Sequence, residues 1–174
     1  MTRVLIGLGS NVGDALGSLR SAVTELRTEV HDLRASPAYR TVPMYVTDQQ
    51  DFTNAAVSCE TSLGPLQLLH LLKALEKELG RRGGQRYGPR EIDLDLIAYG
   101  SASYRFEAAG TVVLQVPHPL VAERRFVLQP LNDLCPKAVL PGLGRISDLL
   151  EKTNEQQGDV VRLEHALLPI HGPG

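Results

Sequence analysis

Two aspartates with one residue between them, Asp93 and Asp95, are the first candidates for chemistry in this sequence. They alternate with Ile92, Leu94 and Leu96, so a β-strand would place both carboxylates on one face and the apolar side chains on the other. Carboxylates spaced about 7 Å apart along a strand are able to bracket a pair of Mg²⁺ ions, which prefer oxygen ligands. The same alternation is also typical of a half-exposed edge strand with solvated aspartates.

The segment before these aspartates is rich in glycine and arginine. It contains Arg81, Arg82, Arg86 and Arg90, interspersed with four glycines. Arginine binds phosphate oxygens in a bidentate manner, and glycine hinges let a loop close over a polyphosphate. The pattern predicts a cationic lid beside a metal site, although a solvated basic loop or an RNA-contacting patch has the same composition. Adjacent carboxylates would repel a nucleic-acid backbone unless metal ions intervened, which disfavours RNA.

Aromatic and amide side chains form a second group of candidates. Phe52 and Asn54 lie two residues apart in a strand-like run, so a ring and an amide would project from one face. This pair suits a flat heteroaromatic ligand, because the ring stacks on it while the amide donates to and accepts from its edge. A core phenylalanine beside an incidental asparagine is the alternative. Among the five histidines, only His118 has suggestive neighbours, since Arg124 and Phe126 follow it closely.

Glycine-rich nucleotide-binding motifs are the next possibility. Gly7, Gly9 and Gly13 follow a strand-like run and precede a helical one, a spacing close to the dinucleotide-binding fingerprint. The third glycine comes one residue late, and the element order lacks the parallel sheet that such a site needs. We therefore interpret these residues as tight-turn glycines. The sequence contains no P-loop pattern, which leaves arginines and metal ions to hold phosphates.

The elements that would position these residues follow the order strand, helix, strand, strand, helix, strand. Apolar and β-branched runs predict strands over residues 2–8, 30–41, 52–61 and 92–99. Leucines at three- and four-residue spacing predict helices over residues 14–26 and 65–79. This order predicts an α+β fold of the ferredoxin-like βαββαβ type, an antiparallel sheet with helices on one face. C-terminal additions are expected as strands over residues 111–116 and 160–163 and a helix over 147–152.

Length and composition restrict the class of protein further. A chain of 174 residues fits one domain, residues 1–174, with a frayed tail from about residue 169. The net charge of −2 offers no general attraction to nucleic acid or to an anionic membrane. Cys59 and Cys135 lack metal-ligand spacing, and the chain has no signal peptide or membrane-spanning run. We therefore expect a cytoplasmic, monomeric protein with small-molecule substrates and neither nucleic-acid nor membrane partners.

Five segments, taken together, resemble the 6-hydroxymethyl-7,8-dihydropterin pyrophosphokinase family and occur in that family's order. They are residues 8–11, 39–43, 51–55, 86–95 and 116–119. The run R-Y-G-P-R-E-I-D-L-D matches the family pattern R-[YW]-G-P-R-x-[IL]-D-[LI]-D, which is highly specific, and the resemblance covers about residues 4–140. It implies an ATP- and Mg²⁺-dependent enzyme of folate biosynthesis. Such an enzyme transfers pyrophosphate from ATP to the pterin alcohol and releases AMP.

The resemblance also implies roles for individual residues. Asp93 and Asp95 would hold two Mg²⁺ ions and, with Arg81 and Arg90, would carry catalysis. The residues implied to bind the pterin are Thr41, Val42, Pro43, Met44, Phe52, Asn54 and Phe126. The residues implied to bind ATP are Glu76, Arg81, Arg82, Arg86, Tyr87, Arg90, Leu96 through its backbone, His118 and Arg124.

Some positions depart from the family pattern, and other functions are conceivable. Val42 and Gln50 stand where we expect prolines, Gly83 lies near an expected arginine, and the arginine loop is about one residue short. A nucleotide- or pterin-sensing module would not need paired aspartates beside a cationic lid. An RNA-binding domain of the same topology should carry exposed aromatic residues and net positive charge. A catalytically inactive relative of the family is the remaining alternative.

Overall fold

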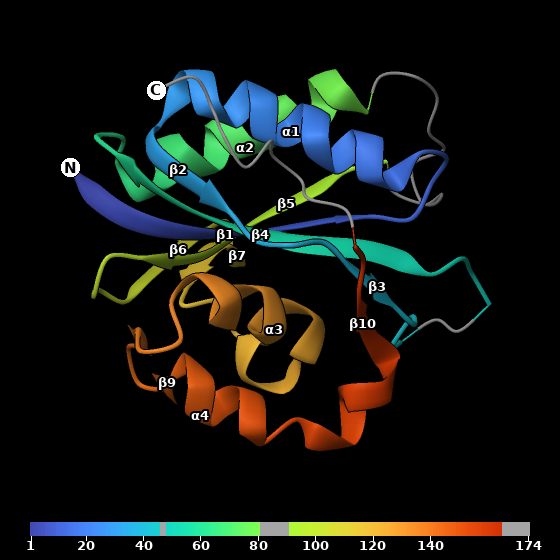
Figure 1. Cartoon of the computed structure of the whole chain (residues 1–174). Coiled ribbons are helices and arrows are strands. Elements are labelled where there is room, and N and C mark those ends of the chain that lie inside the picture. Colours follow the sequence, from blue (N-terminus) through green and yellow to red (C-terminus); the bar gives the residue numbers. More distant parts are fainter. Residues whose placement is uncertain (46–47, 81–90, 165–174) are drawn as a thin grey trace.

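The computed structural model describes residues 1–45, 48–80 and 91–164, and residues 46–47, 81–90 and 165–174 lie outside the described part. An antiparallel six-stranded sheet lies between two layers of helices (Figure 1). Its strands follow the spatial order β10-β3-β4-β1-β5, and β2 also pairs with β4. These strands are β1 (Thr2–Ser10), β2 (His31–Ala35), β3 (Tyr39–Thr41), β4 (Phe52–Thr61), β5 (Asp93–Tyr99) and β10 (Val160–Arg162).

The central strand β1 is buried on both faces. Val4, Ile6 and Leu8 belong to the larger core cluster, whereas Leu5 belongs to a second cluster on the other side of the sheet. Because both faces are covered, this strand consists of a nearly continuous apolar run and does not alternate with polar residues. Each backbone edge of β1 is paired, with β4 on one side and β5 on the other.

Two long helices cover the first face. They are α1 (Ala15–Glu29) and α2 (Pro65–Leu79), and their buried leucines pack in the larger core cluster. The N-cap residue of α1 is Asp14, whose Oδ1 accepts a hydrogen bond from the Gly17 N–H at 3.0 Å. Pro65 occupies the first turn of α2, where its missing N–H costs no hydrogen bond.

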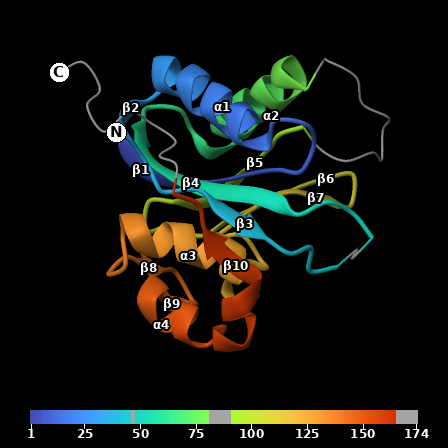
Figure 2. The same cartoon turned by 45° about the vertical axis from the view of Figure 1, so that its right-hand side comes forward.

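The second face is covered by α3 (Arg125–Leu134) and α4 (Ile146–Glu151), which lie on the opposite side of the sheet from α1 and α2 (Figure 2). Leu128 and Leu131 of α3 pack with Ile97 of β5 in the second core cluster. The remaining elements are the hairpin β6 (Tyr104–Ala108) and β7 (Thr111–Val116), the pair β8 (Val139–Leu140) and β9 (Gly144–Arg145), and the 3-10 helices η1 (Val121–Glu123) and η2 (Asn154–Asp159).

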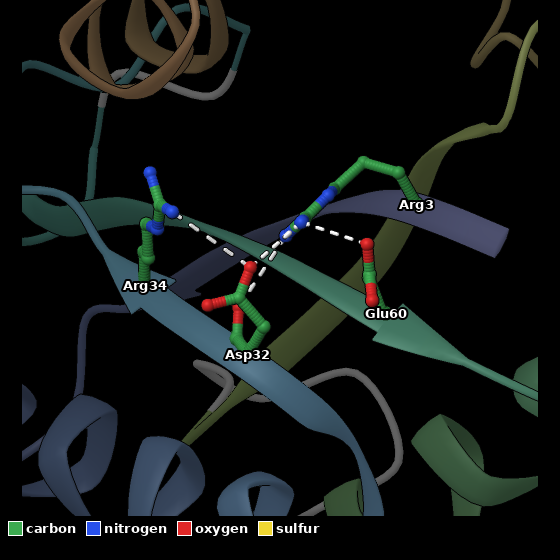
Figure 3. Close-up of polar contacts among 4 residues, drawn as sticks. All are labelled: Arg3, Asp32, Arg34 and Glu60. Atoms are coloured by element: carbon green, nitrogen blue, oxygen red, sulfur yellow. Dashed lines mark hydrogen bonds and ion pairs between the residues drawn. The ribbon is translucent and has the colours of Figure 1, made fainter. Parts of the chain in front are cut away.

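An ion-pair cluster joins the outer parts of β1, β2 and β4 (Figure 3). The Arg3 Nη2 atom lies 2.7 Å from Asp32 Oδ2 and 2.9 Å from Glu60 Oε1, and Arg34 approaches Asp32 at 3.8 Å. The guanidinium of Arg3 lowers the pKa of the Asp32 carboxyl through their hydrogen bond. These side chains are well exposed, so solvent screens the attraction and the cluster contributes little to stability.

The predicted order of strands and helices up to residue 99 is confirmed, except that the strand predicted over residues 30–41 is divided into β2 and β3. The antiparallel sheet and the mixed α/β architecture are also confirmed. The prediction that helices cover one face is wrong, because α3 was not predicted and it covers the other face. Helix α3 is only 10 residues long and contains Pro130, a residue that usually ends or kinks a helix, so little in the sequence indicated a helix there. The hairpin strand β6 was also missed.

The interpretation of the N-terminal glycines as turn residues is correct for only one of them. Gly13 has a positive φ of 57° and lies in the turn before α1, as predicted. Gly7 and Gly9 instead lie inside β1, which extends to Ser10, so a turn does not explain why these positions are glycine.

Candidate active site

A pocket of about 680 Å³ is lined by parts of β1, β4, β5, the chain that connects β3 to β4, and the start of α3. It brings together ten residues predicted from the sequence as site residues. They are Thr41, Val42, Pro43, Met44, Phe52, Asn54, Asp93, Asp95, Arg124 and Phe126. These residues come from segments far apart in the chain, so the fold, and not local sequence, creates the pocket.

Sheet register explains why Gly7 and Gly9 line this pocket. Gly9 is paired with Asn54 on β4 and with Asp93 on β5, and Gly7 is paired with Asp95. Side chains of paired residues project from the same face, so the two glycines leave the space beside the carboxylates empty. A Cβ atom at Gly9 would lie only 2.7 Å from Asn54 Nδ2, which is closer than van der Waals contact.

The acidic end of the pocket has unusual electrostatics. Burial, and next the negative charge of Asp93, raises the pKa of Asp95 to about 6. Lys73 and Arg124 act in the opposite direction through their positive charges. Both causes disfavour the ionised form of Asp95, and a cation bound between the two carboxylates would offset both.

Glu76 lies on α2 beside this acidic strand, outside the pocket lining. Its Oε1 accepts the backbone N–H of Leu94 at 2.7 Å, and its Oε2 lies 3.2 Å from Lys73 Nζ. Burial is the main cause that raises the pKa of Glu76, and the charge of Asp93 adds to it. Glu76 therefore attaches α2 to β5 at the position of the two aspartates.

The other end of the pocket combines aromatic rings with unsatisfied polar atoms. Phe52 and Phe126 both line it. Within the described part of the chain, the buried atoms Thr41 Oγ1, Asn54 Oδ1 and Asn11 Oδ1 have no hydrogen-bond partner. Leaving a buried polar atom unsatisfied costs about 1–3 kcal/mol. A ligand with complementary hydrogen-bonding groups on a flat ring would satisfy these atoms.

Arg124 connects the two ends of the pocket. Its guanidinium lies 5.2 Å from the Tyr45 ring centroid and 5.6 Å from that of Phe126, within cation–π range. Its Nε also donates to the Tyr45 hydroxyl at 3.1 Å. Tyr45 thereby attaches the β3–β4 connection to the start of α3 across the pocket mouth.

Several residues predicted from the sequence lie elsewhere. Leu96 is buried in the core on the opposite face of β5 from the aspartates. His118 lines a second, smaller cavity of about 370 Å³. Burial, and next the charge of Arg124, lowers the pKa of His118, whereas Asp93 raises it. Arg81, Arg82, Arg86, Tyr87 and Arg90, and the departure at Gly83, lie outside the described residues.

The sequence analysis assigned no role to three residues near the site, which are Asn11, Tyr45 and Lys73. Asn11 lines the pocket and its Nδ2 donates to Gln49 Oε1 at 2.9 Å. The sequence signals for Asn11 were its place directly after the glycine-containing strand and its membership of the segment 8–11 that resembles the family. Tyr45 gave no signal, because its contact with Arg124 depends on tertiary structure. Lys73 and Glu76 are three residues apart on a predicted helix, so that spacing was a usable signal for their contact.

A cation at Asp93 and Asp95 would need ligands from outside the described protein residues. Among those residues, no group of three or more histidine, cysteine, aspartate or glutamate side chains is arranged to hold a metal ion. Mg²⁺ commonly binds through one or two carboxylates together with substrate phosphates and water, so the donor set fits Mg²⁺ delivered with a polyphosphate. In the same part of the chain, no helix has the length and apolar character needed to cross a bilayer.

The fold and the pocket together define a mixed α/β protein whose carboxylate pair and ring-binding cleft suit phosphoryl-type transfer to a flat substrate. The model of the 7,8-dihydro-6-hydroxymethylpterin-pyrophosphokinase (HPPK) family matches residues 5–136. The chain belongs to this family, which confirms the resemblance found in the sequence.

Two relatives share substantial identity with the chain. A mitochondrial folate synthesis bifunctional protein of Pisum sativum is 47% identical over 137 residues, which are 78% of this chain and 26% of that protein. The 2-amino-4-hydroxy-6-hydroxymethyldihydropteridine pyrophosphokinase of Methylorubrum extorquens is 42% identical over 82% of this chain and 88% of that protein. The chain thus spans about a quarter of the plant relative but most of the bacterial one.

Solved structures show the same fold. A Plasmodium falciparum HPPK-DHPS crystal structure with pteroate superposes with a TM-score of 0.75, at 15% sequence identity. The superposition covers 92% of this chain and 47% of that chain. At this identity the match describes the architecture, which therefore extends beyond the residues that the family model matches.

Proposed function

We propose that this protein transfers pyrophosphate from ATP to 6-hydroxymethyl-7,8-dihydropterin, giving AMP and the pterin diphosphate, as a step of folate synthesis. Family membership and the names of its relatives support this activity. The observation that carries the proposal is one pocket with a carboxylate pair at one end and rings with unsatisfied polar atoms at the other. A pyrophosphate donor and a flat acceptor could meet there.

The pterin would occupy the end of the pocket formed by Phe52 and Phe126. Its ring would stack against these side chains, and its edge would bond to Thr41 Oγ1 and Asn54 Oδ1, the buried atoms that have no described partner. Backbone groups near Val42 to Met44 would complete this end. Fixing the ring in this way would hold its hydroxymethyl group toward the acidic strand and so reduce the entropic cost of the reaction.

ATP would bind at the acidic end, with Mg²⁺ held by Asp93 and Asp95. When bound, two such ions would neutralise the phosphate oxygens and the charge that develops during transfer. Arg124 would add a positive charge beside the phosphates, and Glu76 would keep β5 in position through its bond to Leu94. The pterin hydroxyl would attack the β-phosphorus and AMP would leave. We assign no protein general base, because positioning and electrostatics supply most of the catalysis in such transfers.

Further parts of the proposal come from the sequence. Arg81, Arg82, Arg86, Tyr87 and Arg90 would contact ATP from the glycine-arginine segment, with Arg81 and Arg90 contributing to catalysis. His118 and the Leu96 backbone would lie toward the nucleotide. The strand order agrees with a ferredoxin-like βαββαβ core, which we propose as the fold type. We also propose a single domain over residues 1–174, a monomer, and a cytoplasmic location.

The test is to incubate the purified protein with ATP, Mg²⁺ and the hydroxymethyl pterin and to identify the nucleotide product. AMP formed in equal amount to pterin diphosphate is the expected result. ADP would indicate an ordinary kinase, and no product would favour an inactive, ligand-binding relative. Asp95→Ala should nearly abolish AMP formation, whereas Asp148→Ala, which alters an exposed aspartate on α4 outside the pocket lining, should not.

A further inference from the structure

The side-chain amide of Gln156, on η2, lies between two backbone groups that flank Arg124. Its Nε2 donates to the Glu123 carbonyl oxygen at 2.9 Å, and its Oε1 accepts from the Arg125 backbone N–H at 3.1 Å. The Arg125 N–H is the first of α3, and the first N–H groups of a helix have no partner within the helix. Gln156 therefore satisfies both backbone groups where η1 ends and α3 begins.

The residue between these two groups is the one whose side chain enters the pocket. Arg124 has extended backbone angles (φ −114°, ψ 97°), and it forms the N-cap position of α3 without a side-chain cap. Its guanidinium lies near the rings of Tyr45 and Phe126. Since the Gln156 amide binds on either side of it, the direction in which Arg124 leaves the backbone depends on Gln156.

Gln156 belongs to the C-terminal segment (residues 154–162), and this segment contacts both walls of the pocket. Strand β10 pairs with β3, Val160 opposite Thr41, and the Val42 N–H donates to the Asp159 carbonyl at 3.0 Å. The buried guanidinium of Arg125 donates to the Leu150 carbonyl oxygen at 3.2 Å, just before this segment. Figures 1 and 2 show η2 and β10 running from α4 past the start of α3 to β3.

The C-terminal segment lies beyond residues 5–136, which the family model matches. The geometry points to Gln156 as a positioning residue that fixes Arg124 in the pocket, and to the C-terminal segment as the link between the Thr41–Val42 wall and the Arg124–Phe126 wall. The kinetic consequence rests on the proposed function, whereas the backbone contacts do not depend on it. Gln156 touches no substrate and acts only through Arg124.

Gln156→Met tests this inference, because methionine has a similar length and makes neither hydrogen bond. With both hydrogen bonds lost, Arg124 should be held less firmly in the pocket, so kcat/KM for AMP formation should fall about tenfold. Gln156→Glu keeps the acceptor atom and loses the donor, so its kcat/KM should fall less than that of Gln156→Met. Gln157→Met is the matched control, since Gln157 is the adjacent, exposed glutamine, and it should leave kcat/KM unchanged.

Two further measurements separate positioning from a general loss of stability. In an Arg124→Ala background, Gln156→Met should cause less than about a twofold further loss, because residues that act through one another are not additive. Hydrogen exchange of the Arg125 amide, followed by mass spectrometry or NMR, should accelerate in Gln156→Met and not in Gln157→Met. Full additivity with Arg124→Ala, or unchanged exchange, would overturn the inference. If the wild-type protein forms no AMP, the proposed function fails, and the exchange measurement alone then decides the role of Gln156.

Discussion

Replacing Asp95 by asparagine should make the metal-free protein more stable above pH 6 while it abolishes AMP formation. Burial and the charge of Asp93 raise the pKa of Asp95 from 3.8 to about 6, so the folded protein holds this proton more tightly than the unfolded chain. The stability that protonated Asp95 contributes is therefore fully present below about pH 3.8 and is lost as the pH rises through about 6.

The size of this effect follows from the difference between the two pKa values. At roughly 1.4 kcal/mol for each pH unit, raising the pKa from 3.8 to about 6 corresponds to about 3 kcal/mol. Asp95 is not completely buried, and the positive charge of Lys73 lowers its pKa, so we expect a gain of about 1–3 kcal/mol. Asparagine has the same shape and remains uncharged at every pH.

The assay is urea unfolding of the wild-type protein and the variant between pH 4 and 8, in the presence of a chelator. The difference in unfolding free energy should be small at pH 4 and should grow up to about pH 7. Wild-type and Asp95→Asn proteins of equal stability across this range would refute the reasoning, because Asp95 would then not be electrostatically strained.

Three further outcomes are expected. Gly9→Ala would place a methyl group 2.7 Å from Asn54 Nδ2, so pterin affinity in a titration should fall roughly tenfold; Gly7→Ala, whose methyl would meet Ile97 at an ordinary 3.5 Å, should lose less. Asp14→Ala removes the N-cap hydrogen bond of α1 and should lower the unfolding free energy by about 1 kcal/mol in urea; an unchanged midpoint would contradict the capping role. Burial raises the pKa of the Cys59 thiol to about 11, so iodoacetamide at pH 8 should alkylate it far more slowly in the native protein than in urea, and equal rates would contradict this.

The parts of the site that were predictable from sequence are those governed by local periodicity. Asp93 and Asp95 alternate with leucines, and a strand places alternate residues on one face, so their common position at the pocket followed directly. The same rule applied to Phe52 and Asn54. The long, regular leucine stripe of α2 likewise made the helix predictable.

Features that depend on contacts between distant segments were not predictable. Tyr45 bonds to Arg124, 79 residues away in sequence, and Gln156 bonds to Glu123, 33 residues away, and no local pattern encodes either contact. The role of Gly7 and Gly9 depends on cross-strand register with β4 and β5, which a single sequence does not specify. Gly7 and Gly9 are nevertheless two residues apart within an apolar run, and this spacing indicates a strand with no side chains at two positions of one face.

The central place of β1 in the sheet has a consequence for protein synthesis. β1 is synthesised before the other strands of the sheet, and its Leu8 pairs with Ala55 and Leu94, which are translated later. Domains generally fold as units as the chain emerges, and pairing between distant strands is slow because long loops must close first. The edge of β1 that pairs with β5 therefore stays unpaired on the nascent chain until β5 has been made.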